Sequence, residues 1–367
     1  MNDMMKRVLF IEPIVAHYRR DTYRLIFSDS RFEFALLAGD SYLDIKPEKV
    51  EKTIISTYRK FTLLGEEFYY LRNSLHHVRH FNPDIVVCSG VDFHHLHTLL
   101  ILLWVKFHPK KKFIWWSHAG LGHQGWWGQM LRKWFYSLSD HILAYSSKGK
   151  ENLRCIEIPE SKVTVVRNSL NQEDYGFDVV RNLTDNESVQ LLFSGRISRQ
   201  KGLDVLIRAV SILNKNGYSL TCKLVGSGDD YEYRELARSL GIGNLVDFVG
   251  PLYGKANEEI FSSSGIFVFP AGIGLSVVHA LSYGLPVITT NNLISHGPEL
   301  ELIRQGVNGD FFEDGNPYDL AAVVEKWIHK VQRYSIEIAS ACHNSVAELE
   351  YTPIKVSEKI LKVLSSF

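Results

Sequence analysis

Two cationic residues, Arg196 and Lys201, stand five positions apart beside a glycine-containing turn in the second half of the chain. They follow the apolar run 191–193 and precede an amphipathic segment over 203–216. In open α/β sheets, ligands bind where a strand ends and the chain turns into a helix. Arg offers a planar fork of donors and Lys a compact charge, which suits a diphosphate that gains charge as it leaves. The alternative is a solvated turn that carries cations by chance.

A second glycine-containing turn follows the apolar run 267–269. Without a side chain, Gly272 and Gly274 let the backbone approach a ligand closely. The N–H groups of Leu275 and Ser276 would open the next helix, where they present partial positive charge to phosphate. The two turns together predict a diphosphate pocket. The alternative is a tight turn in which Ser276 caps the helix.

The first half of the chain also places polar residues directly after apolar runs. His118 follows 113–117, and His17, Tyr18 and Arg19 come soon after the first apolar run. Side chains at the carboxyl ends of parallel strands face the ligand crevice. We therefore expect His118 to hydrogen-bond a ligand and residues 17–19 to line the site of a second substrate. A structural histidine and the polar first turn of a helix are the alternatives.

The sequence does not contain the residue patterns that several other chemistries require. The segment 225–230 has no third glycine of the dinucleotide fingerprint, and no acid stands in the ribose-binding place. Asp229 and Asp230 do not have the DxD spacing of metal-dependent sugar transferases. The histidine groups at 76–80 and 94–97 have no cysteine or carboxylate set to complete a metal site. No P-loop and no GxSxG elbow is present, so we expect neither a dehydrogenase nor a metal enzyme.

Strand and helix patterns alternate along the chain, which is typical of α/β folds with parallel sheets and helices on both faces. A chain of 367 residues is too long for one ordinary core, so two α/β domains are expected. Strands are predicted near 7–12, 32–38, 84–88, 113–117, 141–145, 163–166, 189–194, 219–225, 246–249, 266–269 and 286–289. Helices are predicted near 18–29, 66–80, 94–107, 126–138, 147–155, 203–216, 230–240, 255–263, 275–283, 317–332 and 354–364.

The predicted domains are 1–175 and 189–345, with a polar linker over 176–188 and a final helical segment over 346–367. Residues 1–175 hold 24 Lys and Arg against 19 Asp and Glu, while the remainder holds 17 against 22. A mildly basic first domain would suit an anionic acceptor or an anionic membrane surface, and scattered surface charge is the alternative. The four cysteines are far apart, which favours reduced thiols in the cytoplasm.

The most apolar segment, 96–107, is well short of the roughly 20 residues that span a bilayer. Three lysines at 110–112 follow it. We predict a buried crossover helix with a basic turn, and a surface that touches lipid is the alternative.

These elements, in this order, resemble the family 4 glycosyltransferases of the type found in surface-glycan and exopolysaccharide biosynthesis. The family's GR-x-x-x-x-KG element stands at 195–202, and its P-x-x-E-G-F-G-L … G-x-P-V element at 270–287. Shorter matches lie at 166–169, 225–228, 308–309 and at Tyr18-Arg19. The resemblance implies the GT-B fold, in which two Rossmann-like domains with parallel sheets face each other and a C-terminal helix crosses back to the N-terminal domain.

The resemblance also implies roles for the site residues. Arg196 and Lys201 would neutralise the diphosphate of a nucleotide-sugar, His118 would lie over the donor sugar, and the acceptor would dock on the N-terminal domain. The donor-binding positions it implies are Gly195, Gly226, Gly272, Gly274, Leu275, Ser276, His279 and Glu299, with His17, Tyr18 and Arg19 for the acceptor. Family members are independent of metals and retain the anomeric configuration.

One departure from the family pattern concerns two acidic residues eight positions apart, which stand here as Ala271 and His279. In the family the first approaches the hydroxyls of the donor sugar, and the second holds the ribose. His279 can still donate or accept one hydrogen bond. Glu299, which follows Gly297-Pro298, would substitute for the first acid if its loop folds over the pocket.

The sequence thus predicts a glycosyltransferase that moves a sugar from a UDP- or GDP-sugar to a hydroxyl of a glycan or lipid-linked glycan. No cofactor and no nucleic acid is expected. The predicted location is the cytoplasm, with peripheral attachment to the inner face of the cytoplasmic membrane. A catalytically inactive nucleotide-sugar-binding subunit and a nucleotide-sugar epimerase of the same architecture are the alternatives.

Overall fold

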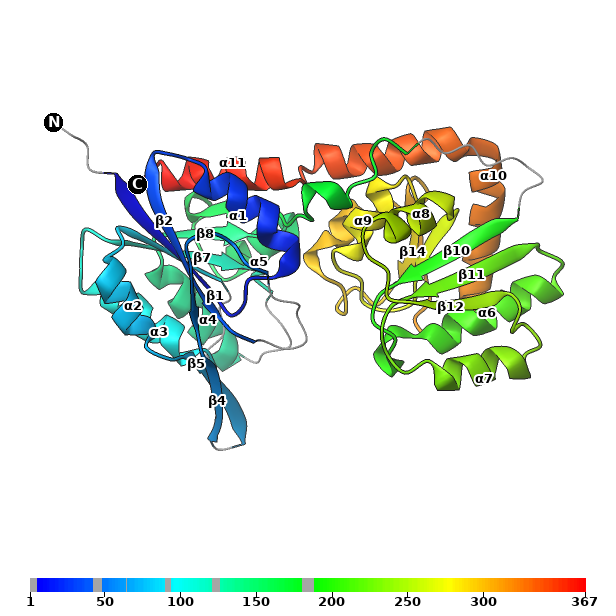
Figure 1. Cartoon of the computed structure of the whole chain (residues 1–367), viewed down its shortest axis with the longest axis horizontal. Helices are drawn as coiled ribbons and strands as arrows, with labels where there is room; N and C mark the ends of the chain where they lie inside the picture. The colour runs from blue at the N-terminus through cyan, green and yellow to red at the C-terminus, as the bar shows by residue number, and fades with distance from the viewer. Residues whose placement is uncertain (1–4, 42–47, 64, 90–93, 121–125, 180–187) are drawn as a thin grey trace. The chain divides into compact units, whose positions relative to one another are not determined.

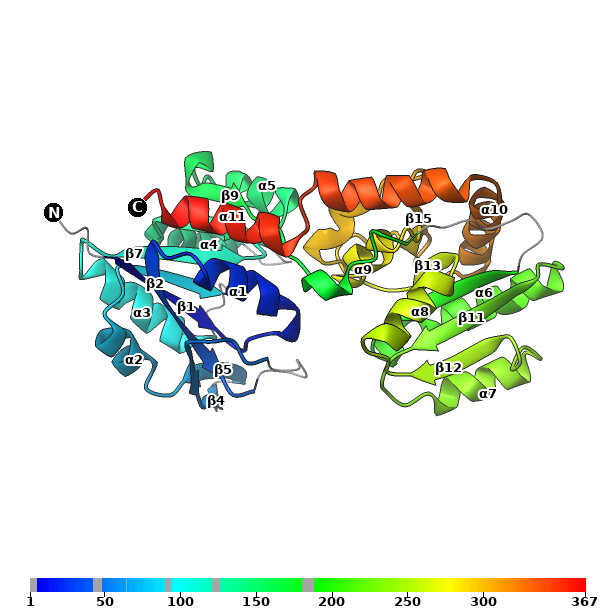
Figure 2. The ribbon, with the colours of Figure 1, turned by 45° about the horizontal axis from the view of Figure 1, so that its top comes forward.

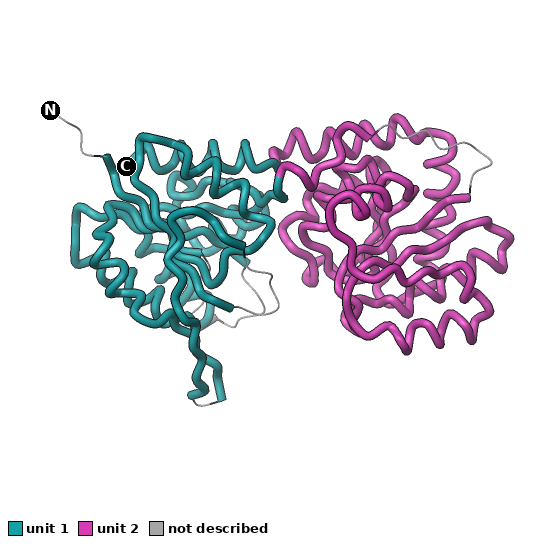
Figure 3. Tube along the Cα trace, viewed as in Figure 1, with its two compact units in different colours: residues 1–171, 352–367 teal, residues 172–351 magenta. Residues whose placement is uncertain are grey.

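The computed structural model describes residues 5–41, 48–63, 65–89, 94–120, 126–179 and 188–367. The chain divides into two compact units, shown in teal and magenta in Figure 3. Unit 1 comprises Met1–Asn171 and Thr352–Phe367, and unit 2 comprises Gln172–Tyr351. The sequence placed these boundaries near 175 and 345, and most of its linker, 180–187, lies outside the described residues.

Unit 1 is built on a seven-stranded sheet in the order β3-β2-β1-β6-β7-β8-β9 (Figure 1). All of its neighbouring strands pair in parallel. The strands are β1 (Lys6–Glu12), β2 (Phe32–Gly39), β3 (Thr53–Ser56), β6 (Ile85–Ser89), β7 (Lys112–Ser117), β8 (His141–Ala144) and β9 (Val163–Val165). The direction of strand order reverses between β1 and β6, which makes this point the topological switch of the sheet.

Helices cover both faces of the unit 1 sheet because its strands are buried apolar runs on both sides. One face packs against α2 (Ser74–Phe81), α3 (Leu96–Lys106), α4 (Trp126–Leu138) and α5 (Ser147–Cys155). The other face packs against α1 (Arg20–Phe27) and α11 (Pro353–Leu364), which lie side by side (Figures 1 and 2).

The C-terminal helix α11 belongs to unit 1 although its sequence follows unit 2. Thr352 caps it by accepting a hydrogen bond from the N–H of Lys355, and Pro353 occupies its first turn. Val356, Ile360 and Val363 recur at helical spacing and are buried in the core beside α1. This arrangement confirms the predicted return of the last helix to the first domain.

The predicted helix over 66–80 is wrong in its first half. Residues Glu66–Leu71 form β5, which pairs antiparallel with β4 (Tyr58–Leu63) in a hairpin, and only then does α2 begin. Four of the six residues of β5 are aromatic or β-sheet-compatible apolar residues, Phe68, Tyr69, Tyr70 and Leu71, which favour strands when a partner is available. That partner is the neighbouring run of β4, so pairing outweighed the helical pattern.

Unit 2 contains a six-stranded parallel sheet in the order β12-β11-β10-β13-β14-β15. The strands are β10 (Val189–Ser194), β11 (Leu220–Val225), β12 (Val246–Gly250), β13 (Ile266–Phe269), β14 (Val287–Thr290) and β15 (Gly309–Phe312). The helices are α6 (Leu203–Lys215), α7 (Tyr231–Ser239), α8 (Lys255–Ser263), α9 (Ser276–Ser282) and α10 (Pro317–Glu348). The switch of strand order falls between β10 and β13.

Two features of unit 2 extend beyond the sequence prediction. The short edge strand β15 was not expected, and α10 continues from the predicted end at 332 to Glu348, where the sequence predicted a second helical segment only from the 340s onward. Tyr334 interrupts α10 with non-helical backbone angles of φ −133° and ψ 37°, so the element is two helical segments joined by a kink.

Candidate functional site

The turns after β10, β11 and β13 meet at the carboxyl edge of the unit 2 sheet. The N–H of Gly195 donates to Val225 O at 2.9 Å, and the N–H of Ile197 donates to Ser227 O at 2.8 Å. The turn after β10 therefore lies directly on the turn after β11. The turn after β10 also meets the turn after β13, because Gly202 lies against Pro270 O, and these two strands flank the switch point of the sheet, where ligands bind in open α/β folds.

Close backbone packing explains two of the predicted glycines. Gly226 has φ +152°, and a Cβ atom there would lie 1.8 Å from Gly195 O. Gly202 has φ +62°, and a Cβ atom there would lie 2.8 Å from Pro270 O, in the turn after β13. Only glycine fits such contacts without a backbone shift. Gly195, Gly202 and Gly226 thus let three turns share one small volume.

Lys201 and Arg196 are held near each other on this frame. Lys201 ends η4 (Arg199–Lys201), is half-buried, and places Nζ 5.1 Å from the centroid of the Phe269 ring. Burial lowers the pKa of Lys201, and the positive charge of Arg196 lowers it further. Two cations in electrostatic contact at a switch point form a site that an anion would stabilise. The third cation of this segment, Arg199, forms an exposed ion pair with Glu232.

The turn after β13 leads into α9, which begins at Ser276 with Leu275 as its N-cap residue. No side chain caps this helix, so the alternative in which Ser276 is the cap is wrong. Gly272 lies against the loop after β14, since a Cβ atom there would be 2.0 Å from Ser295 O. The N–H of Gly297 donates to Ile273 O at 2.8 Å, which joins the same two loops a second time.

Glu299 lies where these two loops meet. Its predicted role as a substitute for the first acid required its loop to lie at this turn. It is buried, with 2% of its surface exposed, in η5 (Pro298–Leu302). A Cβ atom on Gly274 would be 3.9 Å from its Oε2, and one on Gly297 would be 2.6 Å away. The Glu299 carboxylate therefore faces the glycine turn in which the family's first acid is replaced by Ala271. Its role toward a donor sugar stays a prediction.

His296 also connects these two loops, and its hydrogen bonds define which ring nitrogen carries the proton. Its Nδ1 accepts from the N–H of Ile273 at 3.2 Å, so the proton must lie on Nε2, which donates to Thr290 O at 2.9 Å. Burial lowers the pKa of His296, which favours the neutral ring. The loop that carries Glu299 is thus held by a neutral histidine.

His279 lies on α9 and lines a pocket of about 260 Å³. Its ring stacks on Phe261 at 4.1 Å between centroids, and burial lowers its pKa to about 4. The other lining residues are Glu173, Asp174, Gly254, Asn257, Glu258 and Tyr283. Burial and the charges of Glu258 and Asp174 raise the pKa of Tyr283 to about 12. A neutral imidazole in a polar pocket can hydrogen-bond a hydroxyl group. A residue that holds the ribose must form a bond of this kind.

Unit 1 has its own pocket of about 180 Å³ at the carboxyl ends of β1, β6, β7 and β8. It is lined by Glu12, Pro13, Ile14, Ala16, Tyr18, Arg19, Ser89, Trp116, His118 and Tyr145. The structure therefore brings His118, Tyr18 and Arg19 into one pocket, whereas the sequence assigned His118 to the donor sugar and residues 17–19 to the acceptor. His17 is exposed and lies outside this set, and its carbonyl accepts a hydrogen bond from Asn171 Nδ2 at 3.0 Å.

Arg19 is buried at the floor of the pocket rather than extended into it. Its Nη1 bonds Glu12 Oε1 at 2.5 Å and Ser89 Oγ at 3.2 Å, and Nη2 donates to the hydroxyl of Tyr145. Tyr23 also donates to Glu12 Oε1. The guanidinium lies over the Trp116 ring, 4.5 Å from its centroid. Such a network organises the pocket whether or not Arg19 touches a substrate.

His118 lies at the mouth of the pocket, 4.4 Å from the Tyr145 ring between centroids. Desolvation of the ring and then the charge of Arg19 lower the pKa of His118, although the residue as a whole is exposed. The backbone turns sharply after it, because Ala119 has φ +51° and its N–H donates to Ser117 Oγ at 3.1 Å. A neutral His118 can therefore donate or accept one hydrogen bond at the pocket mouth.

Sequence reasoning missed several pocket residues. Glu12 and Tyr145 end the predicted strands 7–12 and 141–145, and neither was singled out as a site residue. Their positions at strand ends were the available signal, since strand ends of one parallel sheet share an edge. Ser89 ends β6 in the same way. Among the described residues, no group of three or more His, Cys, Asp or Glu side chains is placed to hold a metal ion.

Fold and sites together define a protein of two Rossmann-like units, each with polar residues at the switch point of a parallel sheet. Two family models match it: "Glycosyl transferases group 1" over residues 177–339 and "Glycosyltransferase Family 4" over residues 28–174. Between them they cover most of both units. The chain belongs to this glycosyltransferase family, which confirms the resemblance drawn from the motifs.

Curated relatives match over part of the chain. An uncharacterized glycosyltransferase of Methanocaldococcus jannaschii, MJ1607, is 30% identical over 51% of this chain and 50% of its own length. The amylovoran biosynthesis glycosyltransferase AmsK of Erwinia amylovora is 26% identical over 52% of this chain and 47% of its own length. The chain spans about half the length of the curated relatives that it matches.

Solved structures match over nearly the whole chain. The lipopolysaccharide outer core galactosyltransferase WaaB has a TM-score of 0.67 at 17% identity, covering 98% of this chain and 99% of its own. A glycosyltransferase from Rickettsia africae gives 0.73 at 18%, with 98% and 97% coverage. Anabaena HepE in complex with UDP-glucose gives 0.66 at 16%, with 98% and 100% coverage. These likenesses confirm the GT-B fold.

Proposed function

We propose that this protein transfers a sugar from a UDP- or GDP-sugar to a hydroxyl group of a glycan or lipid-linked glycan, with retention of anomeric configuration. The observation that carries the proposal is the pair of cations, Arg196 and Lys201, held together by glycine turns at the switch point of unit 2. Membership of the family and the UDP and UDP-glucose bound by HepE support a nucleoside-diphosphate donor.

In this proposal the bond between the anomeric carbon and the diphosphate breaks as the acceptor oxygen attacks from the same face. The leaving phosphate takes the proton of the acceptor hydroxyl, so no carboxylate nucleophile is needed. Arg196 and Lys201 stabilise the charge that develops on the diphosphate. Each charge-assisted hydrogen bond contributes about 1.5–3 kcal/mol, so each cation is worth about ten- to hundredfold in rate or affinity.

The remaining site residues take supporting roles in the same proposal. His279 hydrogen-bonds the ribose, and Glu299 accepts hydrogen bonds from the donor sugar in place of the acid missing at Ala271. His118 hydrogen-bonds the donor sugar as a neutral imidazole. Tyr18 contacts the acceptor, while Arg19 holds the pocket in shape through Glu12.

The test is turnover of UDP- and GDP-sugars by purified protein, followed by the variants Arg196→Ala and Lys201→Ala. We expect each variant to lose at least about tenfold in kcat/KM. Arg199→Ala is the matched control, because Arg199 lies in the same segment but pairs with Glu232. A loss of less than tenfold in the two variants, or an equal loss in the control, would count against the assigned role.

Ala271 favours a second candidate, in which the chain binds a nucleotide-sugar without transferring it. A methyl group stands where the family has a carboxylate. Calorimetric titration with UDP- and GDP-sugars separates the two candidates. Binding without turnover in the presence of glycan and lipid-linked acceptors would support the inactive subunit.

A lipid-linked acceptor would bring the substrate to a membrane surface, so we place the protein in the cytoplasm with peripheral attachment to the inner face of the cytoplasmic membrane. No helix in the described part of the chain is both long enough and apolar enough to cross a bilayer.

A further inference from the structure

Both backbone groups of Ile273, in the turn that leads into α9, are bonded by the loop after β14. The N–H of Ile273 donates to His296 Nδ1 at 3.2 Å, and its carbonyl accepts from the N–H of Gly297 at 2.8 Å. Ile273 itself is 1% exposed. Two adjacent residues of one loop therefore fix the peptide groups on either side of Ile273, and with them the course of the turn.

The loop that carries His296 is anchored at both of its ends. Asn292 Nδ2 donates to Asp314 Oδ2 at 3.0 Å, and Thr290 Oγ1 donates to the other oxygen of the same carboxylate at 2.8 Å. At the far end of the loop, Glu299 is buried in η5. His296 lies between these two fixed ends, so a change in its hydrogen bonding acts on its contact with the turn.

The turn that His296 holds belongs to the donor site assigned above. Thr289 Oγ1 donates to Ala271 O at 3.1 Å and so fixes the start of the turn. On its other side the turn packs on the segment of the two cations, since a Cβ atom on Gly202, next to Lys201, would lie 2.8 Å from Pro270 O. The course of the turn therefore sets the space beside those cations.

Only the neutral ring of His296 can make both of its bonds. Its Nε2 donates to Thr290 O at 2.9 Å, while its Nδ1 accepts from Ile273. A protonated ring carries a hydrogen on each nitrogen, so Nδ1–H would face the N–H of Ile273 with no acceptor between them. Rotating the ring by half a turn offers no second arrangement, because it brings a carbon atom to each bonding position. The contact with the turn is therefore lost when the ring gains a proton.

We infer that His296 is a positioning residue for the donor: the neutral ring holds the turn after β13 in the shape that binds the nucleotide-sugar, and the protonated ring releases it. His296 acts through the backbone of Ile273 and not on the donor itself. The inference rests on the proposed function for the identity of the ligand, while the hydrogen bonds that carry it belong to unit 2 alone.

The groups around His296 decide where its protonation falls. Burial lowers the pKa of His296, and a hydrogen bond to a backbone carbonyl and the charge of Asp314 oppose that effect without cancelling it. The other ionisable groups on the elements that meet here are Glu299 of η5 and the cations Arg196 and Lys201 after β10. Because the pKa lies below the ordinary value of about 6.5, the neutral ring prevails at neutral pH and is lost in acid. Donor affinity should therefore be complete at neutral pH and fall as pH falls through this pKa.

The first test removes the acceptor at about pH 8, where the ring is neutral. His296→Asn keeps an oxygen near the place of Nδ1, whereas His296→Leu leaves the buried N–H of Ile273 without an acceptor. Calorimetric titration with UDP-glucose and with GDP-mannose measures donor affinity. We expect His296→Leu to bind about fivefold or more weakly and His296→Asn to stay within about threefold of the wild type. His329→Leu is the matched control, because His329 is exposed on α10 and bonds Tyr218 instead.

The second test follows donor affinity from about pH 8 to about pH 5. In the wild type the loss should approach about tenfold per pH unit below the pKa of His296, because one proton competes with the donor. The nucleotide-sugar adds no such change, since both of its phosphates are esterified and lack the second ionisation that a terminal phosphate has at about pH 6. His296→Asn should abolish the fall in affinity, and His329→Asn should leave it unchanged.

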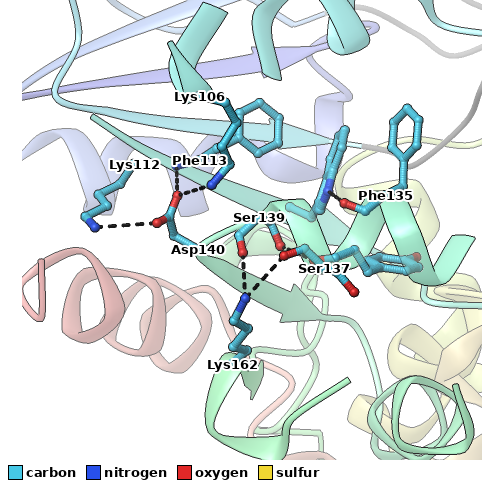
Figure 4. A network of polar contacts seen from close by, with 10 residues as sticks. Lys106, Lys112, Phe113, Phe135, Ser137, Ser139, Asp140 and Lys162 are labelled. Carbon is cyan, nitrogen blue, oxygen red and sulfur yellow. Dashed lines mark hydrogen bonds and ion pairs between the residues drawn. The ribbon is translucent and has the colours of Figure 1, made fainter. Parts of the chain in front are cut away.

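Hydrogen exchange tests the turn without any ligand. Peptides that contain Ile273 should exchange faster in His296→Leu than in the wild type, and the wild type should approach that variant in acid after correction for the intrinsic effect of pH. Phe113 supplies an internal reference, because its N–H also donates to a side chain, the carboxylate of Asp140, at 2.9 Å (Figure 4). The other partners that Figure 4 draws to this carboxylate are two lysines and not histidines. Protection of Phe113 should be the same in all variants.

Three results would overturn the inference: donor binding by His296→Leu that equals the wild type, a loss in His296→Asn as large as in His296→Leu, or the same pH profile in the wild type and His296→Asn. The thermal midpoint at each pH establishes that unit 2 remains folded. If His296→Leu does not fold, the comparison of the wild type with His296→Asn across pH still decides. If neither nucleotide-sugar binds the wild type, the proposed function fails, and hydrogen exchange at Ile273 still decides whether His296 holds the turn.

Discussion

The buried pair of Glu12 and Arg19 allows a quantitative test of what organises the unit 1 pocket. The two residues are 4% and 8% exposed and bond at 2.5 Å, so each charge relies on the other for solvation. Removal of one partner from a buried pair typically costs about 3–5 kcal/mol, while replacement of both by apolar side chains is often close to neutral. We therefore expect Arg19→Met to destabilise unit 1 by about 3–5 kcal/mol, because it leaves the Glu12 carboxylate buried with Tyr23.

The double variant Glu12→Met/Arg19→Met should regain most of that loss. The coupling energy from a double-mutant cycle should therefore be about 3 kcal/mol. The assay is urea unfolding followed by tryptophan fluorescence, since six of the seven tryptophans lie before residue 135, in unit 1. This probe reports mainly on unit 1 even if the two units unfold separately.

Additive effects, or a cost below about 1 kcal/mol for Arg19→Met, would refute the reasoning from the buried pair. Kinetics of the double variant then separate the two roles of Arg19. If Arg19 contacts the acceptor, the double variant will be stable yet show a raised KM for acceptor. If it only supports the pocket, restored stability will be accompanied by an acceptor KM near that of the wild type.

Three further predictions concern unit 2. His279→Ala should weaken nucleotide binding more than His279→Glu in calorimetric titration, because only glutamate can still bond the ribose; equal affinities would remove that role. Gly226→Ala should lower the thermal midpoint and raise the donor KM at least tenfold, because its Cβ would lie 1.8 Å from Gly195 O, whereas Gly243→Ala, with nearest contact 3.5 Å, should do neither. Burial lowers the pKa of His296, so its stabilisation of unit 2 should be complete above its unfolded pKa of about 6.5 and decline as pH falls below that value; a His296→Asn variant with the same pH dependence of the urea midpoint would contradict this.

The elements that the sequence predicted well are those whose signals are local. Arg196, Lys201 and the glycines around them lie in turns directly after β10 and β13, where the sequence placed them, while the shared anion site that their spacing indicates stays a prediction. Most strands of both sheets were predictable because a strand buried on two faces is a continuous apolar run, whereas the edge strands β3 and β15 were not predicted. The β4–β5 hairpin was missed because β5 becomes a strand only through its pairing with β4.

The unit 1 pocket shows the limit of local signals. Tyr18 and His118 were predicted from their places after strands, but the partners that bury Arg19 were not. Glu12, Ser89 and Tyr145 come from three different strands, separated from Arg19 by 7, 70 and 126 positions. Nothing in a single sequence relates such positions until the strand order of the sheet is known.

The sequence by itself therefore determined the family and the two-unit α/β architecture, because glycine turns, cations and apolar runs act through neighbours along the chain. Only the tertiary structure decided which side chains share a pocket. It turned Glu299 toward Gly274 and buried Arg19 against Glu12. Those outcomes depend on packing between segments far apart in the chain, where burial and charge pairing outweigh any local preference.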